Sequence, residues 1–173
     1  MKRTIALLTT LCCTLLLAAQ QPMAELQGEF ADGRTMVLPA GLKGRPAVIG
    51  LAFGKAAQGQ LESWYEPAYL RFVAKHGLFA GSSNAQVLFV PLFVGLNKAA
   101  YEPSLKQFRK SATPEVADLV LFCKVENDVR QALGLERENT AYFLVLDAEG
   151  RIVHREQGAY ALQKLDALEE ALW

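Results

Sequence analysis

The chain has 173 residues, of which 18 are basic and 18 are acidic, so it carries no net formal charge. A length of this order is typical of one domain. The basic residues form no stripe and the acidic residues form no tail, so nucleic acid is excluded as an expected partner.

The first residues have the pattern of a secretory signal peptide. Lys2 and Arg3 precede a mostly apolar stretch, Ile5 to Ala19, and small residues follow at Ala18, Ala19 and Ala24. This stretch is too short and wrongly flanked for a membrane span. We therefore predict a signal peptide over residues 1–24, cleaved after Ala19 or Ala24. A single domain over residues 25–173 follows, with no transmembrane span of its own, in the periplasm or another exported compartment.

Two of the three cysteines, Cys12 and Cys13, fall inside the predicted signal. A lipoprotein site at this pair ranks second, because Leu11 is bulky where lipid attachment requires a small residue. Cys123 then remains as a single thiol, so no internal disulfide is predicted. Its apolar surroundings favour a buried, hydrophobic role. The alternative is a lone reactive thiol.

Strands and helices alternate after the signal. Glu29 to Leu38 predicts a β-hairpin, with its turn at Asp32-Gly33. Ala47 to Phe53 is apolar throughout, as expected for a strand covered on both faces. Apolar residues three and four apart predict a helix from about Gln60 to His76, kinked at Pro67.

The second half of the chain continues this alternation. Pro91 is anomalous inside an otherwise buried strand and predicts a bulge there. Asn127 or Asp128 is expected to cap a short helix. The remaining predicted elements are a strand over 87–94, a helix over 101–111, a strand over 119–125, a short helix ending at Gly134, a hairpin over 141–146 and 151–155, and a final helix with Leu162, Leu165, Leu168 and Leu172 on one side. This order indicates an α/β sandwich with a mixed central β-sheet flanked by helices.

Three segments carry a resemblance to a known superfamily. They are Gly44-Arg-Pro-Ala-Val-Ile, Asn127-Asp-Val-Arg-Gln-Ala-Leu-Gly-Leu and Phe143-Leu-Val-Leu-Asp-Ala-Glu-Gly-Arg-Ile. In this order they resemble the thioredoxin-like fold, in its version with an N-terminal β-hairpin and an inserted strand–helix unit. Ser63-Trp-Tyr-Glu-Pro and the second hairpin are most similar to a cysteine-free, redox-inactive branch, the mitochondrial ATP synthase assembly-factor family.

Redox members of this superfamily need a Cys-x-x-Cys motif at the N-terminus of the kinked helix, where the helix stabilises a thiolate. Counting from the strand places this motif at Ala56 and Gly59, and counting back from the helix proline places it at Gly59 and Glu62. Neither alignment contains a cysteine. The cis-proline that the family uses beside the motif is replaced at Thr140-Ala141. The resemblance therefore implies the shape of the fold without its usual redox site.

No catalytic residue, metal site or cofactor is predicted. His76 and His154 lie far apart in a chain without a Cys or Met cluster, so they give no metal-ligand spacing. His76 is expected to cap its helix beside Gly77, and His154 to be solvated. Glu62 and Glu66, four residues apart, are expected to lie on a polar face and not to form an acid–base pair.

The residues that we expect to contact a partner are Phe53, Lys55, Trp64, Tyr65 and Tyr142, around the segment with which redox relatives hold their substrates. Core packing is the alternative for Trp64 and Tyr65.

These features predict an exported thioredoxin-like protein that acts as a non-catalytic binding or assembly-assisting module for an envelope or membrane protein. The partner is expected to be a protein, held as an extended peptide in the groove of the redox relatives. The alternative is a thiol–disulfide or peroxide-handling protein that uses Cys123 alone. A small-ligand carrier in the same groove ranks third.

Overall fold

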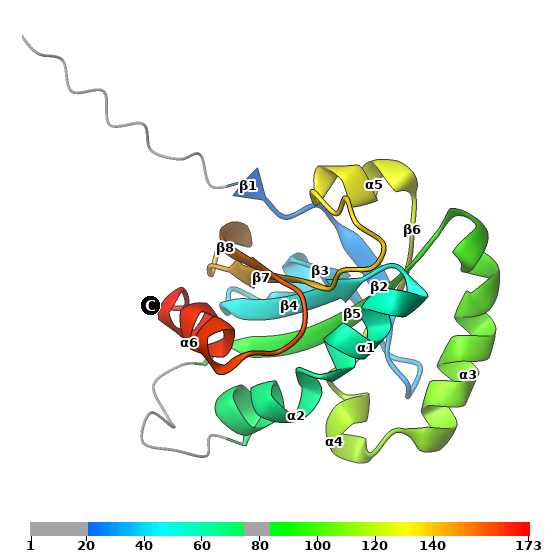
Figure 1. The fold of residues 1–173 in the computed structure, drawn as a ribbon, viewed down its shortest axis with the longest axis horizontal. Helices are drawn as coiled ribbons and strands as arrows, with labels where there is room; N and C mark the ends of the chain where they lie inside the picture. The colour runs from blue at the N-terminus through cyan, green and yellow to red at the C-terminus, as the bar shows by residue number, and fades with distance from the viewer. Residues whose placement is uncertain (1–20, 75–83) are drawn as a thin grey trace, which may run out of the picture.

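The structure is a computed structural model, and it describes residues 21–74 and 84–173. Within these residues a mixed sheet has the strand order β1-β8-β7-β4-β5-β6-β2-β3 (Figure 1). The strands are β1 Gln21–Pro22, β2 Leu26–Glu29, β3 Thr35–Leu38, β4 Ala47–Ala52, β5 Gln86–Val94, β6 Phe122–Val125, β7 Tyr142–Leu146 and β8 Arg151–Gln157. The three central strands β4, β5 and β6 are parallel, and their outer neighbours are antiparallel.

Helices cover the two faces of the sheet unequally, with α5 on one side and most of the longer helices on the other (Figure 1). The α-helices are α1 Lys55–Glu62, α2 Tyr65–Ala68, α3 Tyr101–Ser111, α4 Pro114–Ala117, α5 Asn127–Ala132 and α6 Leu162–Glu170. A π-helix, η2 Tyr69–Val73, continues α2, and 3-10 turns lie at η1 Ala40–Leu42 and η3 Gly95–Ala100.

The sheet separates two apolar clusters. Strand β4 is buried along its whole length, and alternate residues contribute to opposite clusters: Ile49 and Leu51 face the α5 side, whereas Val48 faces α1 and α6. Helix α1 packs closely onto this strand at Gly50. A Cβ atom there would lie 2.9 Å from Leu61 Cδ1 and 2.8 Å from Phe143 Cε1, so glycine permits the contact.

Several predictions are confirmed by these elements. The mixed α/β sandwich is present, the hairpin β2–β3 pairs Glu29 with Thr35, and α3 has the predicted bounds. Strands β7 and β8 form the second hairpin. Gly134 ends α5 in a left-handed conformation, with φ of 68°.

The predicted long helix is wrong in its start and in the position of its break. It begins at Lys55, and it breaks at Ser63 and Trp64, before Pro67. Pro67 is therefore the third residue of α2, where a backbone N–H has no partner inside the helix and its loss costs nothing. His76 and Gly77 lie outside the described residues.

Pro91 does not interrupt β5. It stays paired with Ala52 of β4, and its missing N–H affects only the other side of the strand. There the contact with the predicted strand 119–125 is divided into an isolated bridge, Phe89 to Val120, and a ladder that resumes at Leu92.

Three smaller expectations need correction. Glu126, and neither Asn127 nor Asp128, is the N-cap of α5, and its side chain makes no capping bond. Leu162 is 52% exposed, although Leu165 and Leu168 are buried as predicted. The folded region also begins before residue 25, because β1 pairs with β8 and Met23 is buried.

Candidate functional site

The segment in which redox relatives carry two cysteines forms the start of α1. Gly54 is the N-cap, Lys55 is the first helical residue, and Ala56 and Gly59 are exposed. The start of the helix therefore agrees with the alignment that places the motif at Ala56 and Gly59. Neither side chain can act as a nucleophile.

The loop that precedes β7 lies against the start of α1. A Cβ atom on Gly54 would be 2.2 Å from the carbonyl oxygen of Glu138, so only glycine allows this approach of the two backbones. The loop contains the Thr140-Ala141 position. The only cis peptide bond in the described ranges is Leu38–Pro39, so the bond at Thr140-Ala141 is trans.

Gln60 joins α1 to this loop through both ends of its side-chain amide. Its Nε2 donates to the carbonyl oxygen of Asn139 at 2.9 Å, and its Oε1 accepts from the backbone N–H of Ala141 at 3.1 Å. Each polar atom of the amide therefore has a backbone partner. No local pattern in the sequence indicates this bridge, because its two ends are about eighty positions apart.

A second loop, between β8 and α6, completes the arrangement. The backbone N–H of Gly158 donates to the Ala141 carbonyl at 2.8 Å, and Trp64 Nε1 donates to the Gly158 carbonyl at 3.1 Å. Ser63 Oγ accepts from the backbone N–H of Tyr160 at 3.0 Å. We call Gln60, Ser63, Trp64 and the loops 139–141 and 158–160 the clamp.

The clamp leaves few backbone groups for a peptide at this end of α1. The Asn139 carbonyl, both backbone polar groups of Ala141 and both of Gly158 already bond within the chain. An extended peptide that added to these groups as a strand would have to displace those bonds. The clamp is thus a closed structural element at the position where the resemblance places the redox motif.

The structure does not bring the five expected partner-binding residues together. Phe53 and Tyr142 belong to the cluster on the α5 side of the sheet, whereas Trp64 and Tyr65 belong to the opposite cluster. Phe53 is 4% exposed and Trp64 is fully buried, which corrects their expected role as surface contacts. Lys55 remains exposed at the start of α1.

The aromatic residues of this set have structural contacts. The Trp64 ring lies 4.1 Å from that of Phe143, between centroids, so Trp64 fits the core-packing alternative. Tyr65 is half-buried against Phe89, and burial together with the charge of Glu62 raises the pKa of the Tyr65 hydroxyl. The Tyr142 hydroxyl accepts a hydrogen bond from the backbone N–H of Arg137 at 2.8 Å.

Cys123 lies on β6 and is buried, as its apolar surroundings indicated. Burial raises the pKa of its thiol to about 12. At neutral pH the side chain is therefore the protonated thiol, which is a poor nucleophile. The neighbouring Lys124 is directed elsewhere: it pairs with Glu102 at 3.0 Å and lies 4.0 Å from the centre of the Tyr101 ring.

His154 is half-buried, which corrects the expectation that it is solvated. Its Nε2 is enclosed and has no hydrogen-bond partner within the described residues. Across residues 21–74 and 84–173, no group of three or more His, Cys, Asp or Glu side chains is placed to hold a metal ion.

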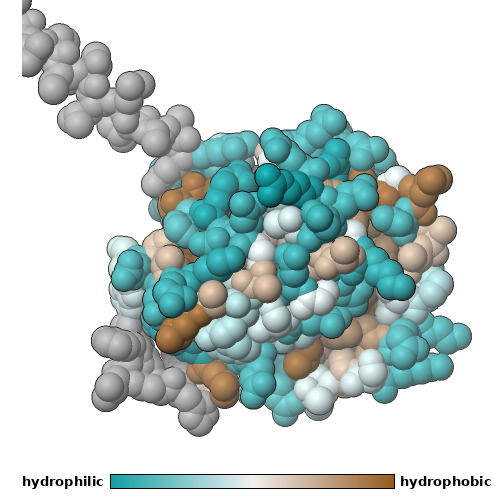
Figure 2. Space-filling model, viewed as in Figure 1, coloured by the Kyte–Doolittle hydropathy of each residue, from teal (hydrophilic) through white to brown (hydrophobic). Residues whose placement is uncertain are grey.

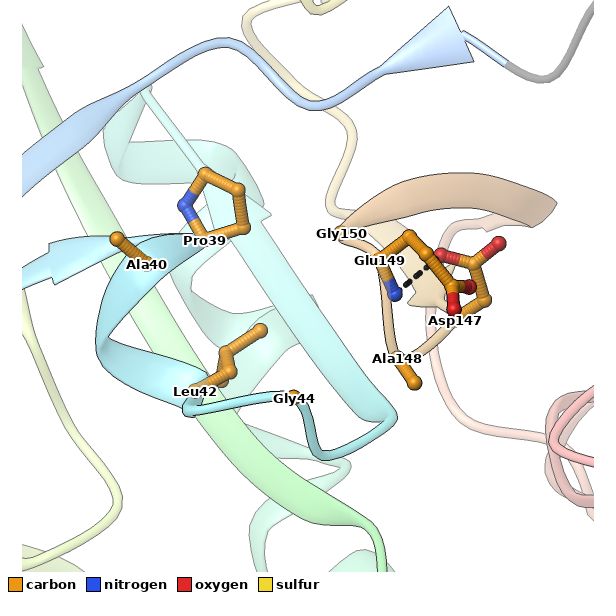
Figure 3. A pocket seen from close by; sticks show the side chains of 8 residues that line it. All are labelled: Pro39, Ala40, Leu42, Gly44, Asp147, Ala148, Glu149 and Gly150. Carbon is orange, nitrogen blue, oxygen red and sulfur yellow. Dashed lines mark hydrogen bonds between the residues drawn. The ribbon is translucent and has the colours of Figure 1, made fainter.

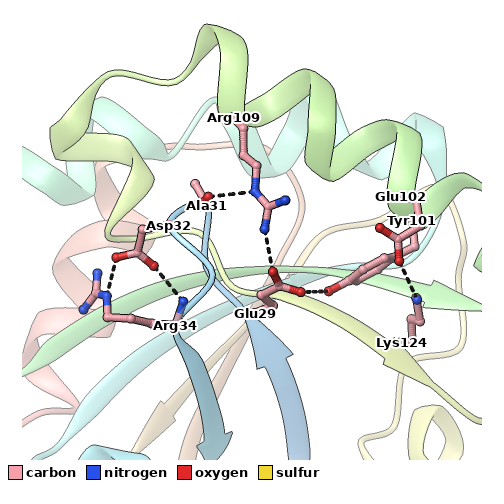
Figure 4. A network of polar contacts seen from close by, with 8 residues as sticks. All are labelled: Glu29, Ala31, Asp32, Arg34, Tyr101, Glu102, Arg109 and Lys124. Atoms are coloured by element: carbon pink, nitrogen blue, oxygen red, sulfur yellow. Dashed lines mark hydrogen bonds and ion pairs between the residues drawn. The ribbon is translucent and has the colours of Figure 1, made fainter.

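A polar network on the opposite edge of the sheet fixes the first hairpin (Figure 4). Arg109 of α3 binds the carboxylate of Glu29 and donates to the Ala31 carbonyl at 2.7 Å. Tyr101 also approaches Glu29, and burial and this carboxylate raise the pKa of Tyr101 to about 12. These contacts tie the hairpin to α3 and serve the fold.

Two hollows open on the surface of the described residues. The smaller, of about 130 Å³, lies between η1 and the β7–β8 turn and is lined by Pro39, Leu42, Asp147 and Glu149 among others (Figure 3). The carboxylate of Asp147 already accepts hydrogen bonds there, from the backbone N–H groups of Glu149 and Arg151. The larger, of about 290 Å³, lies between α2 and α6.

Comparison with known proteins identifies the fold. No family model and no curated protein matches the sequence. Among solved structures, the chain is similar to a putative thiol:disulfide interchange protein DsbE from Chlorobium tepidum, with 14% identity, a TM-score of 0.60, and coverage of 89% of this chain and 97% of that one. It is also similar to BsSco, of the Sco family of cytochrome c oxidase assembly proteins, with 10% identity, a TM-score of 0.57, and coverage of 88% and 92%.

A third similar structure is the exposed lipoprotein thioredoxin Etrx1 from Streptococcus pneumoniae, with 16% identity, a TM-score of 0.55, and coverage of 85% and 99%. Each of these matches covers more than four fifths of both chains. The chain therefore has a thioredoxin-like fold, as the resemblance implied. None of the helices in its described part is long and apolar enough to cross a membrane.

Proposed function

We propose that this chain is an exported, redox-inactive member of the thioredoxin-like class that binds a protein partner and assists its assembly. The proposed partner is an envelope or membrane protein. The resemblance to the cysteine-free assembly-factor branch motivates the assembly role. One of the similar structures, BsSco, also belongs to a family of assembly proteins.

One observation carries this proposal: the clamp occupies the place of the redox site. The helix start offers Lys55, Ala56 and Gly59 where the chemistry of the class needs thiols, and Gln60 closes the adjoining loop. Cys123 is buried and protonated. This arrangement supports a role in binding without thiol chemistry.

A disulfide reductase assay tests the absence of redox activity. It measures how fast a small-molecule thiol reduces the disulfides of insulin in the presence of the protein. We expect no rate above background for the wild type, and the same result for Cys123→Ala. In native protein, Cys123 should resist an aromatic disulfide reagent until denaturant is added. Turnover that Cys123→Ala loses would establish the redox alternative instead.

Partner binding needs its own experiment. The tagged full chain, expressed in its own cell and cross-linked before extraction, should co-purify a defined envelope or membrane protein. Recovery of folded, exported protein without any partner would contradict the binding role.

Export leaves a signature at the N-terminus. Cleavage after Ala24 would remove β1 and the buried Met23, whereas cleavage after Ala19 keeps both. We therefore expect intact-mass measurement of the exported protein to give a chain that begins at Gln20. A chain that begins at Glu25, or one that retains the signal without export, would contradict this assignment.

A further inference from the structure

An open groove of about 290 Å³ separates the α2–η2 segment from α6. Its lining consists of Glu66, Pro67, Leu70, Arg71, Tyr160 and Leu165. We propose that this groove docks an apolar segment of a partner protein that carries Lys or Arg beside its apolar residues. This inference rests on the proposed binding function and names the surface that performs it.

One large apolar side chain in the lining, Leu70, is exposed, and two more are exposed on the elements that form the walls. Leu70 is 41% exposed, and Val73, three residues further along η2, is 42% exposed. Leu162, which precedes the buried groove residue Leu165 by three positions on α6, is 52% exposed. Figure 2 shows apolar side chains at the lower left, where Figure 1 places α2 and α6. Exposed apolar residues grouped around a hollow mark an interaction surface, whereas single ones do not.

Contacts within the chain connect the walls of the groove. Arg71 connects its two walls, because the guanidinium binds Glu169 and lies 3.2 Å from Asp166 on α6. Tyr160 is held by two other residues of the clamp. Its backbone N–H donates to Ser63 Oγ, and its ring packs edge-on against that of Trp64, with 5.5 Å between the ring centroids. A preformed site loses less ordering entropy on binding than a flexible one.

Charge indicates the chemistry of the partner. Glu66 and Arg71 line the groove, and Arg71 pairs with both Asp166 and Glu169 of α6, so among the described residues three carboxylates lie beside one guanidinium there. The nearby Lys164 is already engaged by the Gln157 carbonyl and by Glu156. An excess of negative charge favours a cationic segment and repels an anionic bilayer, so it selects a basic, apolar stretch of protein over a membrane surface.

The size of the groove is consistent with such an occupant. Sites that enclose a small molecule have volumes of about 300–1,000 Å³ and bury most of their ligand. At about 290 Å³ and open along one side, this groove fits a few side chains of a longer segment that continues beyond it.

Fluorescence anisotropy with defined probes tests this surface in the folded full chain. One probe is a labelled peptide with a leucine-rich centre and flanking lysines; its counterpart has the same centre and flanking glutamates. Vesicles of phosphatidylglycerol serve as the anionic membrane probe. The groove variants are Leu70→Ser and Glu66→Lys in the lining, and Leu162→Ser on α6, three residues before the lining residue Leu165.

Leu96→Ser is the matched control, because Leu96 is 99% exposed on η3, an element that contributes no residue to the lining of the groove. Thermal melting of each variant checks that it is folded. We expect the lysine-flanked peptide to bind more tightly than its counterpart, with an affinity that falls as salt rises. Leu70→Ser and Leu162→Ser should each weaken it by about tenfold. Glu66→Lys should weaken it by about two- to fivefold, and Leu96→Ser should leave it unchanged.

The inference would be overturned if the two peptides bound equally or not at all, or if the protein preferred the vesicles. It would also be overturned if Leu70→Ser and Leu96→Ser had equal effects. A different result would reject the proposed function. A cross-linked native partner whose recovery does not depend on Leu70 or Leu162 would reject the groove and retain the binding role, whereas the absence of any native partner would reject the binding role itself.

Discussion

The clamp and the groove lie side by side and share Tyr160. They differ in whether their side chains already have partners within the chain. In the clamp, the amide of Gln60 and the indole N–H of Trp64 have hydrogen-bond partners within the chain. At the groove, Leu70 in the lining and Leu162 on the adjoining part of α6 remain exposed without a covering element in the described residues. A closed polar network serves the fold, and an open apolar surface is available for recognition.

Replacement of Trp64 tests the structural role of the clamp with the largest effect. Trp64→Ala removes a fully buried ring and the bond to Gly158, so we expect a loss of about 3–5 kcal/mol in the free energy of unfolding. Chemical denaturation followed by circular dichroism measures it. Trp173→Ala is the control, because Trp173 is 69% exposed, and its change should stay within about 0.5 kcal/mol. Similar losses for both variants would contradict the assignment.

Two glycines of the same segment should respond in opposite directions. In Gly54→Ala, the new methyl group would meet the Glu138 carbonyl, so we expect a loss of about 1–3 kcal/mol as the loop moves away. Gly59 is inside α1 with no atom within 4 Å of a new Cβ, so Gly59→Ala should gain about 0.5–1 kcal/mol through helix propensity. Stability changes of the same sign would refute the close approach of the loop to α1.

Gln60→Ala removes the bridge between α1 and the loop before β7. Two hydrogen bonds to backbone groups are lost, and we expect a cost of about 1–2 kcal/mol together with faster amide exchange at Ala141. Gln58→Ala is matched to it, because Gln58 is exposed and its side chain bonds no described residue besides Glu62, at 2.8 Å. Unchanged exchange at Ala141 in Gln60→Ala would show that the bridge does not hold the loop.

The groove variants should have the smallest effects on stability. Leu70 and Leu162 are about half exposed, so Leu70→Ser and Leu162→Ser should each cost no more than about 1 kcal/mol. Equilibrium denaturation of both proteins measures this. Losses as large as that of Trp64→Ala would mean that the two leucines serve the core, and the contrast between the two regions would disappear.

The sequence was informative where a local pattern determines the structure. The apolar run 47–52, the turn at Asp32-Gly33 and the helix 101–111 are each specified by neighbouring residues, and they are present. The break at Ser63 was missed because proline is tolerated in the first turn of a helix, so the chain restarts α2 ahead of Pro67.

The candidate site could be predicted only in part. The absence of cysteines near α1 is visible in the sequence, but the bonds of Gln60 join residues far apart in the chain. The groove likewise depends on how α6 packs beside η2, which places Leu162 at the surface although its spacing matches that of buried Leu165. The strand β1 was missed because Gln21–Pro22 resembles the end of a signal peptide and forms a strand only through pairing with β8.

Site-specific photo-cross-linking in the native cell tests the central claim most directly. Benzoylphenylalanine is placed in the full chain at Leu162, between the lining residues Tyr160 and Leu165 in sequence, or at Gln58 on the exposed side of α1 beside the clamp. Binding through the groove predicts a discrete covalent adduct with an envelope or membrane protein from position 162 and none from position 58. An adduct from position 58 alone, or from neither position in folded protein, would contradict the account.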